Sequence, residues 1–351
     1  MMTTVQVNIS EKKTSYDINI GSGFITGKIK EFSEKGYFFI IDKKVASLYS
    51  AIMPDKKTFI FKSGENFKTL SSLEKMLRFL KNGGCLRSDT LVVIGGGVTG
   101  DTAAMAASLY MRGIKLIQLP TTLLAMVDSG VGGKTAVNFD GIKNNIGSFY
   151  QPSQVIIDTD FLNTLSKKEF LNGFAECIKI AAISDKDFFD YLKSEKNKIL
   201  KRDNDVMSKV IKRSCELKAD IVEQDEKEAG IRKLLNFGHT LAHAIETDSK
   251  HRIKHGYAVA MGMAIESKIA FDLGYTDDET YMAITDILSL FGYPLSYSAK
   301  NLDIMLNAAA KDKKAGKSGI AIAISGKNMK GEIVNIGMDA LTEQIRKICA
   351  P

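Results

Sequence analysis

The sequence predicts an N-terminal α/β domain followed by a mainly α-helical domain. Short apolar runs that end in glycine or acidic residues alternate with helical spacing up to about residue 158, which indicates a parallel sheet covered by helices. From about residue 166 onward, helical spacing dominates. All four histidines of the 351 residues then fall within the stretch 239–255. We expect the two domains to comprise residues 1–162 and 163–351.

The composition is ordinary for a globular protein, with 44% hydrophobic and 25% charged residues. No apolar run approaches the length of a membrane span, and the first residues lack a signal-peptide core. The four cysteines are scattered without a CxxC pair, which argues against a disulfide framework and favours a reducing compartment. We therefore expect a cytoplasmic protein without a membrane partner.

The net charge of +7 arises from basic and acidic residues that are mixed along the chain. A basic nucleic-acid-binding module is conceivable, but aromatic and basic residues do not alternate and no motif that reads nucleic acid is present. The positive excess suits a small anionic substrate better. We expect no nucleic-acid partner.

Several elements are expected before the first glycine-rich motif. In chain order they are a hairpin of strands 5–9 and 16–20, a strand at 37–42, a strand at 58–62 and a helix at 70–80. The strand at 37–42 is a continuous apolar run that ends in Asp42. In an open α/β sheet, such a strand is buried and delivers its terminal carboxylate to the ligand-binding edge.

The next motif is Gly95-x-Gly97-x-x-Gly100, which follows a strand at 91–95 and precedes a helix at 103–110. Glycines allow the backbone to approach a pyrophosphate, and the helix N-terminus faces its negative charge. This context predicts a dinucleotide site. Since no acidic residue follows about twenty positions later to bind the ribose, the preceding Asp42 is the better candidate, which implies a variant strand order.

A glycine-rich segment at 128–147 lies between expected strands at 114–119 and 154–158. It contains Lys134 and Lys143, and it predicts a loop that faces a phosphate group. The alternative is a surface turn with solvated lysines.

The second half contains helical spacing and one late pair of strands. Helices are expected at 170–183, 205–222, 234–247, 256–273 and 277–290, and a hairpin at 320–324 and 332–336. Within this half, His239 and His243 are four residues apart, so they share one face of a helix. Two imidazoles on one face form half of a tetrahedral metal site. The alternative is a pair of histidines with hydrogen bonds in the core or in solvent, but four histidines so close together favour metal chemistry.

Several motifs in this order resemble the 3-dehydroquinate synthase family between about residues 40 and 316. They are 95–101 (GGGVTGD), 120–129 (PTTLLAMVDS), 132–134 (GGK), 143–144 (KN), 173–176 (GFAE), 236–240 (NFGHT) and 255–256 (HG). The resemblance implies a homodimeric enzyme with an NAD-binding α/β domain and a helical C-terminal domain that binds one divalent ion, zinc or cobalt. It implies conversion of the seven-carbon sugar acid phosphate DAHP to 3-dehydroquinate and phosphate in the shikimate pathway.

The resemblance also assigns site residues. The metal ligands are Glu176, His239 and His255, so His243 becomes a proton-transfer group rather than a ligand. The cofactor positions are Asp42, Glu65, Lys68, Gly96, Gly97, Val98, Asp101, Thr121, Thr122, Asp128, Lys143 and Thr164. The substrate positions are Arg112, Asp128, Lys134, Asn144, Lys179, Lys218, Arg232, Asn236, His243 and Lys313. The catalytic group comprises His243, Lys134, Lys179, Lys218, Arg232 and Asn236, and Arg112 is expected to reach the phosphate pocket of the neighbouring subunit.

In the family's reaction, NAD⁺ oxidises a ring alcohol, phosphate is eliminated, the hydride returns, and the ring opens and closes again by an intramolecular aldol step. Two alternatives stay open. One is another sugar-phosphate cyclase that acts on sedoheptulose 7-phosphate or glucose 6-phosphate, and the other is a metal- and NAD-dependent polyol dehydrogenase. The presence of Lys218, Arg232, Asn236 and His243 favours a substrate that bears a carboxylate.

Overall fold

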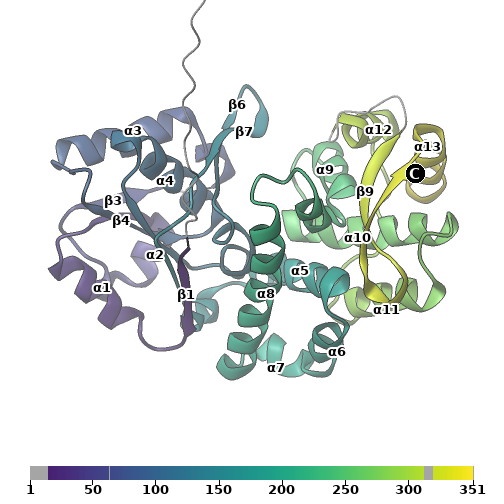
Figure 1. Ribbon diagram of the computed structural model, residues 1–351, viewed down its shortest axis with the longest axis horizontal. Helices are drawn as coiled ribbons and strands as arrows, with labels where there is room; N and C mark the ends of the chain where they lie inside the picture. Colours follow the sequence, from purple (N-terminus) through teal and green to yellow (C-terminus); the bar gives the residue numbers. More distant parts are fainter. Residues whose placement is uncertain (1–14, 63, 312–318, 351) are drawn as a thin grey trace, which may run out of the picture.

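The structure is a computed structural model, which describes residues 15–62, 64–311 and 319–350. Its strands are β1 Asp17–Gly21, β2 Phe38–Asp42, β3 Thr58–Phe61, β4 Thr90–Gly95, β5 Lys115–Pro120, β6 Lys134–Phe139, β7 Ile142–Phe149, β8 Gln154–Asp158, β9 Ile320–Ser325 and β10 Gly331–Ile336. Its α-helices are α1 Ile25–Glu34, α2 Lys43–Leu48, α3 Leu70–Asn82, α4 Gly97–Leu109, α5 Lys167–Ser184, α6 Lys186–Ser194, α7 Lys196–Lys201, α8 Asn204–Gln224, α9 His239–Asp248, α10 His255–Asp272, α11 Asp278–Leu290, α12 Leu302–Lys311 and α13 Met338–Cys349. Figure 1 shows the sheet-containing part beside a mainly helical part, with α5 and α8 between them. The predicted fold class is confirmed.

The main sheet has six strands in the order β1-β8-β5-β4-β2-β3, and every pairing in it is parallel. β2 and β4 are adjacent, with Ile41 opposite Ile94, and both strands are entirely buried. Asp42 and Gly95 therefore end neighbouring strands at one edge of the sheet. The strand that ends in Asp42 is thus the neighbour of the glycine-rich strand although it precedes it in the chain, as the prediction of a variant order requires.

The first strand has a partner that the sequence did not indicate. β1 pairs in parallel with β8, with Asp17 opposite Gln154. Its predicted hairpin partner, 5–9, lies outside the described residues. The carboxylate of Asp158 holds the end of β1 by accepting hydrogen bonds from the backbone N–H groups of Phe24 and Ile25, both at 2.9 Å.

The predicted glycine-rich loop at 128–147 is wrong in its second part, because β6 and β7 form an antiparallel hairpin. Thr135 and Val137 are buried, whereas Lys134 on the same strand is exposed, so the segment alternates as a strand does. The strands join at Asp140 and Gly141, both of which have positive φ angles. Figure 1 shows this hairpin extending from the sheet-containing part toward the side on which α9 lies.

The predicted helix at 234–247 is interrupted, because a 3₁₀ segment covers Ile231–Asn236 and α9 begins only at His239. Gly238 has a φ of +80°, and a Cβ atom there would lie 2.8 Å from the carbonyl oxygen of Val259 on α10. The glycine therefore ends the first segment and lets α9 pack closely against α10. Glu266 on α10 strengthens this contact, since its carboxylate accepts hydrogen bonds from Gly238 N at 2.6 Å and Leu241 N at 2.9 Å.

One hydrophobic core joins strands and helices, because the same cluster includes Val92 of β4, Leu119 of β5 and Phe174 of α5. The change from sheet to helices falls at the 3₁₀ segment Thr159–Thr164. The domain limits 1–162 and 163–351 stay a prediction. The late hairpin is confirmed as β9 and β10. Within the described ranges, no helix has the length and apolar character that crossing a membrane requires.

Candidate active site

Glu176 of α5 and two helix-opening histidines, His239 of α9 and His255 of α10, form a compact group of metal donors. One donor atom from each residue lies within 4.8 Å of the others. The Nε2 atoms of His239 and His255 lie 3.7 and 3.5 Å from Glu176 Oε1. This oxygen is buried and has no hydrogen-bond partner among the described residues. Two imidazoles and a carboxylate are a ligand set of catalytic zinc sites, so these residues fit a divalent ion.

The electrostatics of the group keep Glu176 ionised. Burial by itself raises the pKa of Glu176, but the Lys179 ammonium and the two imidazoles hold it well below its usual range. Lys179 also forms an ion pair with Glu176 Oε2, so only Oε1 faces the histidines. Burial and the Lys179 charge lower the pKa of His239. Burial also opposes protonation of His255, yet Glu176 and Glu246 on either side raise its pKa to about 10.

His243 lies on the same helix as His239, but the structure does not bring it into the donor group. The ring centroids of His239 and His243 are 5.7 Å apart, whereas those of His239 and His255 are 5.2 Å apart. His243 lines the adjoining cavity instead. The i, i+4 spacing therefore indicates a shared helix face, while the third donor comes from the next helix.

A cavity of about 580 Å³ opens beside the donor group. Most of the expected substrate residues line it, together with two of the expected metal ligands. These are Asp128, Lys134, Asn144, Lys179, Lys218, Arg232, Asn236, His243, His239 and His255. The exposed Arg112 is not among the lining residues, and Lys313 lies outside the described residues. The volume suits a small polar ligand.

Buried cations face this cavity from α8 and the segment that follows it. Lys218 forms an ion pair with Asp128, and its Nζ also donates to the backbone carbonyl of Asp128 at 2.6 Å. Burial lowers the pKa of Lys218, although the Asp128 carboxylate opposes this shift. Arg232 is 1% exposed, and its Nη2 donates to the Gly132 carbonyl at 3.0 Å. The site thus concentrates positive charge where an anionic ligand would be desolvated.

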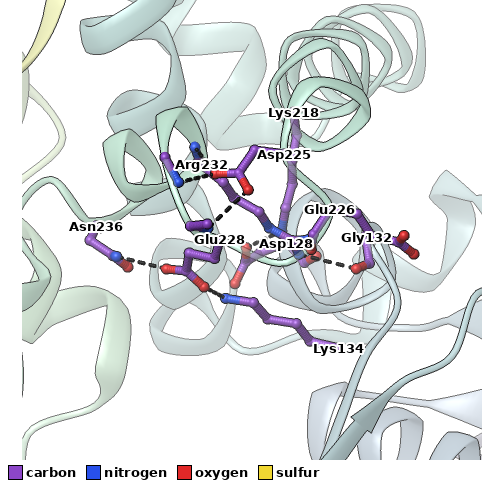
Figure 2. A network of polar contacts seen from close by, with 11 residues as sticks. Asp128, Gly132, Lys134, Lys218, Asp225, Glu226, Glu228, Arg232 and Asn236 are labelled. Atoms are coloured by element: carbon purple, nitrogen blue, oxygen red, sulfur yellow. Dashed lines mark hydrogen bonds and ion pairs between the residues drawn. The ribbon is translucent and has the colours of Figure 1, made fainter. Parts of the chain in front are cut away.

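Glu228 is a carboxylate in this site that sequence reasoning missed. Figure 2 shows it between Asn236 and Lys134: it accepts a hydrogen bond from Asn236 Nδ2 at 2.8 Å and forms an ion pair with Lys134. The loop that carries it is folded around Asp225, which accepts hydrogen bonds from Gly230 N at 2.7 Å and Arg232 N at 3.1 Å. The acidic run 225–228, shortly before Arg232, was the available signal.

A second cavity, of about 270 Å³, lies at the glycine-rich edge of the sheet. Seven expected cofactor residues line it: Asp42, Gly96, Gly97, Val98, Thr121, Thr122 and Thr164. Asp42 caps α2, where Oδ1 accepts a hydrogen bond from Lys44 N at 2.7 Å. A Cβ atom on Gly97 would lie 3.0 Å from Ser129 Oγ, so glycine keeps the start of α4 accessible.

The other expected cofactor residues lie elsewhere. Asp101 and Asp128 line the larger cavity. The Nζ atom of Lys68 donates hydrogen bonds of 2.6 Å to both Asp101 and Asn144. Glu65 accepts a hydrogen bond from Asn138 at 2.8 Å, and Lys143 pairs with Glu246 at 3.6 Å. These contacts tie the β6–β7 hairpin to the segment 65–68 and to α9.

Comparisons with known proteins identify related sequences and structures. Family models described as the 3-dehydroquinate synthase N-terminal and C-terminal parts match residues 58–172 and 173–315. The 3-dehydroquinate synthase of Alkaliphilus metalliredigens (strain QYMF) is 42% identical over 322 residues, which cover 89% of this chain and 90% of that protein. That of Thermodesulfovibrio yellowstonii (strain ATCC 51303 / DSM 11347 / YP87) is 40% identical over 353 residues, which cover 97% of this chain and 94% of that protein.

Two solved structures share the fold at 24% sequence identity. One is ValA (2-epi-5-epi-valiolone synthase) from Streptomyces hygroscopicus subsp. jinggangensis 5008 with NAD⁺ and Zn²⁺ bound, with a TM-score of 0.87 and coverage of 97% of this chain and 99% of that chain. The other is a 2-deoxy-scyllo-inosose synthase complexed with carbaglucose-6-phosphate, NAD⁺ and Co²⁺, with a TM-score of 0.85 and coverage of 96% and 98%. Since the family models span consecutive parts and the relatives cover nearly the whole chain, this chain belongs to the 3-dehydroquinate synthase family.

Proposed function

We propose that this chain is a 3-dehydroquinate synthase that converts DAHP to 3-dehydroquinate and phosphate, with NAD at the glycine-rich edge and a divalent ion, zinc or cobalt, on Glu176, His239 and His255. The observation that carries the proposal is the unpartnered Glu176 Oε1, which faces two imidazoles at 3.5 and 3.7 Å beside a cavity lined by cations. This arrangement suits a substrate that carries both hydroxyls and anionic groups.

The bound groups supply hydride transfer, from NAD, and polarisation of substrate oxygens, from the ion. The chain's own residues bind and orient the substrate. Arg232 offers a planar guanidinium that can grip a carboxylate or phosphate through two hydrogen bonds, and Lys134 and Lys179 act as point charges. Lys218 and His243 hold or move protons, because burial lowers the pKa of Lys218 and an imidazole ring can both donate and accept a proton. Orientation contributes much of the rate, since the later steps are intramolecular.

The proposal includes a homodimer in the cytoplasm, in which residues 1–162 bind NAD and 163–351 bind the ion. Arg112 supports the dimer, because its side chain is exposed and lies outside the cavity of its own chain. The exposed Leu109 and Met111 flank this region at 50% and 47% exposure. An apolar surface around an arginine is suited to an interface that carries the guanidinium to a neighbouring site.

The experiment that tests this function mixes purified protein, NAD⁺, zinc and DAHP, and follows phosphate release and carbocycle formation together. Equal yields of phosphate and 3-dehydroquinate, without net NADH, are expected. Parallel reactions with sedoheptulose 7-phosphate and glucose 6-phosphate test the other cyclase activities. Net NADH from a polyol, with no phosphate released from DAHP, would replace this function with that of a dehydrogenase.

A further inference from the structure

Glu246 of α9 touches both the metal-donor group and the β6–β7 hairpin. The residue is 6% exposed. Its Oε1 atom lies 3.5 Å from His255 Nδ1, and its Oε2 atom lies 3.6 Å from Lys143 Nζ. Each carboxylate oxygen therefore has its own cationic or polar neighbour, one from α10 and one from the hairpin.

We propose that Glu246 is a positioning residue for His255, an inference that rests on the proposed metal site. In the neutral ring that a metal ion requires, a His255 Nδ1–H group that donates to Glu246 leaves the lone pair on Nε2, and this atom lies 3.5 Å from Glu176 Oε1. A carboxylate behind a ligating imidazole fixes the tautomer and ring orientation and makes the ring a stronger donor. His255 needs such a partner, because it opens α10 and its side chain is partly exposed.

The second imidazole is held differently. His239 Nδ1 lies 3.2 Å from the backbone carbonyl of Phe237, so the chain itself orients this ring. A backbone carbonyl is neutral and cannot be lost by mutation, whereas Glu246 is a charged side chain. The two ligands thus share one geometry, with Nδ1 toward an acceptor and Nε2 toward Glu176, but only His255 depends on a carboxylate.

Lys143 contacts the Glu246 oxygen that lies farther from His255. A buried carboxylate with a single partner is costly, and Lys143 supplies the second charge. Because Lys143 belongs to the hairpin and Glu246 to α9, the orientation of a metal ligand depends on a contact between the two parts of the chain. We expect the effects of removing Glu246 and Lys143 to be non-additive, since both act on the same carboxylate.

The test measures Co²⁺ and Zn²⁺ affinity of the full chain without NAD or substrate, from the visible absorption of Co²⁺ and by competition with Zn²⁺. Glu246→Gln preserves shape and removes charge, and it is expected to weaken metal binding by about 10- to 100-fold and to alter the Co²⁺ spectrum. Lys143→Met should give a smaller loss, and the double variant should bind no more weakly than Glu246→Gln. Wild-type affinity and spectrum in Glu246→Gln would overturn the proposal.

Asp248→Asn is the matched control, because Asp248 is another buried carboxylate on α9 but contacts Tyr297 instead of the donor group. It should lower stability without changing metal affinity. If Glu246→Gln failed to fold, wild-type metal affinity in Lys143→Met would overturn the proposal. If Glu176, His239 and His255 do not form a metal site at all, the result is different: the wild-type chain would then bind Co²⁺ and Zn²⁺ no more tightly than His239→Ala.

Discussion

Glu176 Oε1 and His255 Nε2 lie 3.5 Å apart although they come from different helices, α5 and α10. No hydrogen-bond partner in the described ranges satisfies this carboxylate oxygen, and His239 approaches it from a third helix. A buried oxygen in this state costs free energy unless a cation or proton binds there. The unsatisfied Glu176 oxygen therefore marks Glu176, His239 and His255 as the place where a cation would stabilise the protein.

Glu176→Gln replaces the charged donor oxygens by a neutral amide of the same shape. We expect phosphate release to fall to background, and zinc affinity to fall by at least about tenfold. The measurement is turnover after chelation and stepwise addition of zinc, with metal content determined in parallel. Near-wild-type turnover after zinc addition would contradict the assignment of Glu176 as a ligand.

Lys134→Met removes a cation that faces the larger cavity and leaves Glu228 without its ion-pair partner. A charged hydrogen bond contributes about 1.5–3 kcal/mol, so KM for DAHP should rise by at least about tenfold and its salt dependence should weaken. Lys30→Met on α1 is the control, because Lys30 is an exposed lysine that lines neither cavity. An unchanged KM in Lys134→Met would mean that this lysine does not bind the substrate.

Gly96→Val places a branched side chain at the glycine-rich edge, where a Cβ atom already lies 3.1 Å from Thr122 Cγ2. The valine would occupy space that the dinucleotide needs, and NAD⁺ affinity should fall by at least about tenfold. Calorimetric titration with NAD⁺ measures this loss. Gly27→Ala on α1 serves as control, because nothing lies within 4 Å of its added Cβ atom and the cofactor affinity should not change.

Asp248→Asn tests a pH-dependent contribution to stability. Burial by itself raises the pKa of Asp248, but the Tyr297 hydroxyl at 2.6 Å and the Lys300 and Asn301 amides at 2.7 and 2.8 Å lower it. A lowered folded-state pKa stabilises the protein above the unfolded carboxyl pKa of about 3.9, and this stability is lost as pH falls through the folded value.

We therefore expect Asp248→Asn to lose about 1–3 kcal/mol of unfolding free energy at pH 7. The difference from the wild type should shrink when urea unfolding is repeated near pH 3.5, because Asp248 of the unfolded wild-type chain begins to bind protons there. A constant difference across the pH range would show that the charge of Asp248 contributes nothing.

Arg112→Ala tests whether the arginine completes the site of a second subunit. The variant alone and His239→Ala alone should both be inactive. Dimers formed from both chains should regain about a quarter of wild-type activity, because half of the dimers are mixed and each of these has one complete site. Absence of regained activity in mixtures that sedimentation shows to be dimeric would place Arg112 outside the partner's site.

Much of the fold follows from local patterns. The buried strands β2 and β4 are uninterrupted apolar runs, and α10 has a long helical apolar pattern, so their sequence identifies them. The short helices α1 and α2 were missed, because each buries few side chains and lies between two strands. The glycines and lysines of the β6–β7 hairpin predict a loop, because they obscure an alternation that only the burial pattern makes evident.

The site was less accessible to sequence reasoning without the family resemblance. The histidine spacing points to His239 and His243, whereas the donor group pairs His239 with Glu176 and His255, which only packing of α5, α9 and α10 brings together. Glu228 and Glu246 were missed for a related reason. An acidic residue in a helix or a charged loop is usually solvated, and only long-range contacts show that these two face cations and imidazoles.

The close packing of α9 against α10 has a consequence for metal binding. Glu266 and the close approach at Gly238 fix how α9 packs against α10, and these two helices begin with His239 and His255. Because these contacts involve no metal ion, Glu176, His239 and His255 would hold a cation without a rearrangement of the helices. An enzyme built in this way would keep its fold when its ion is withdrawn, and the empty site would be ready to accept another.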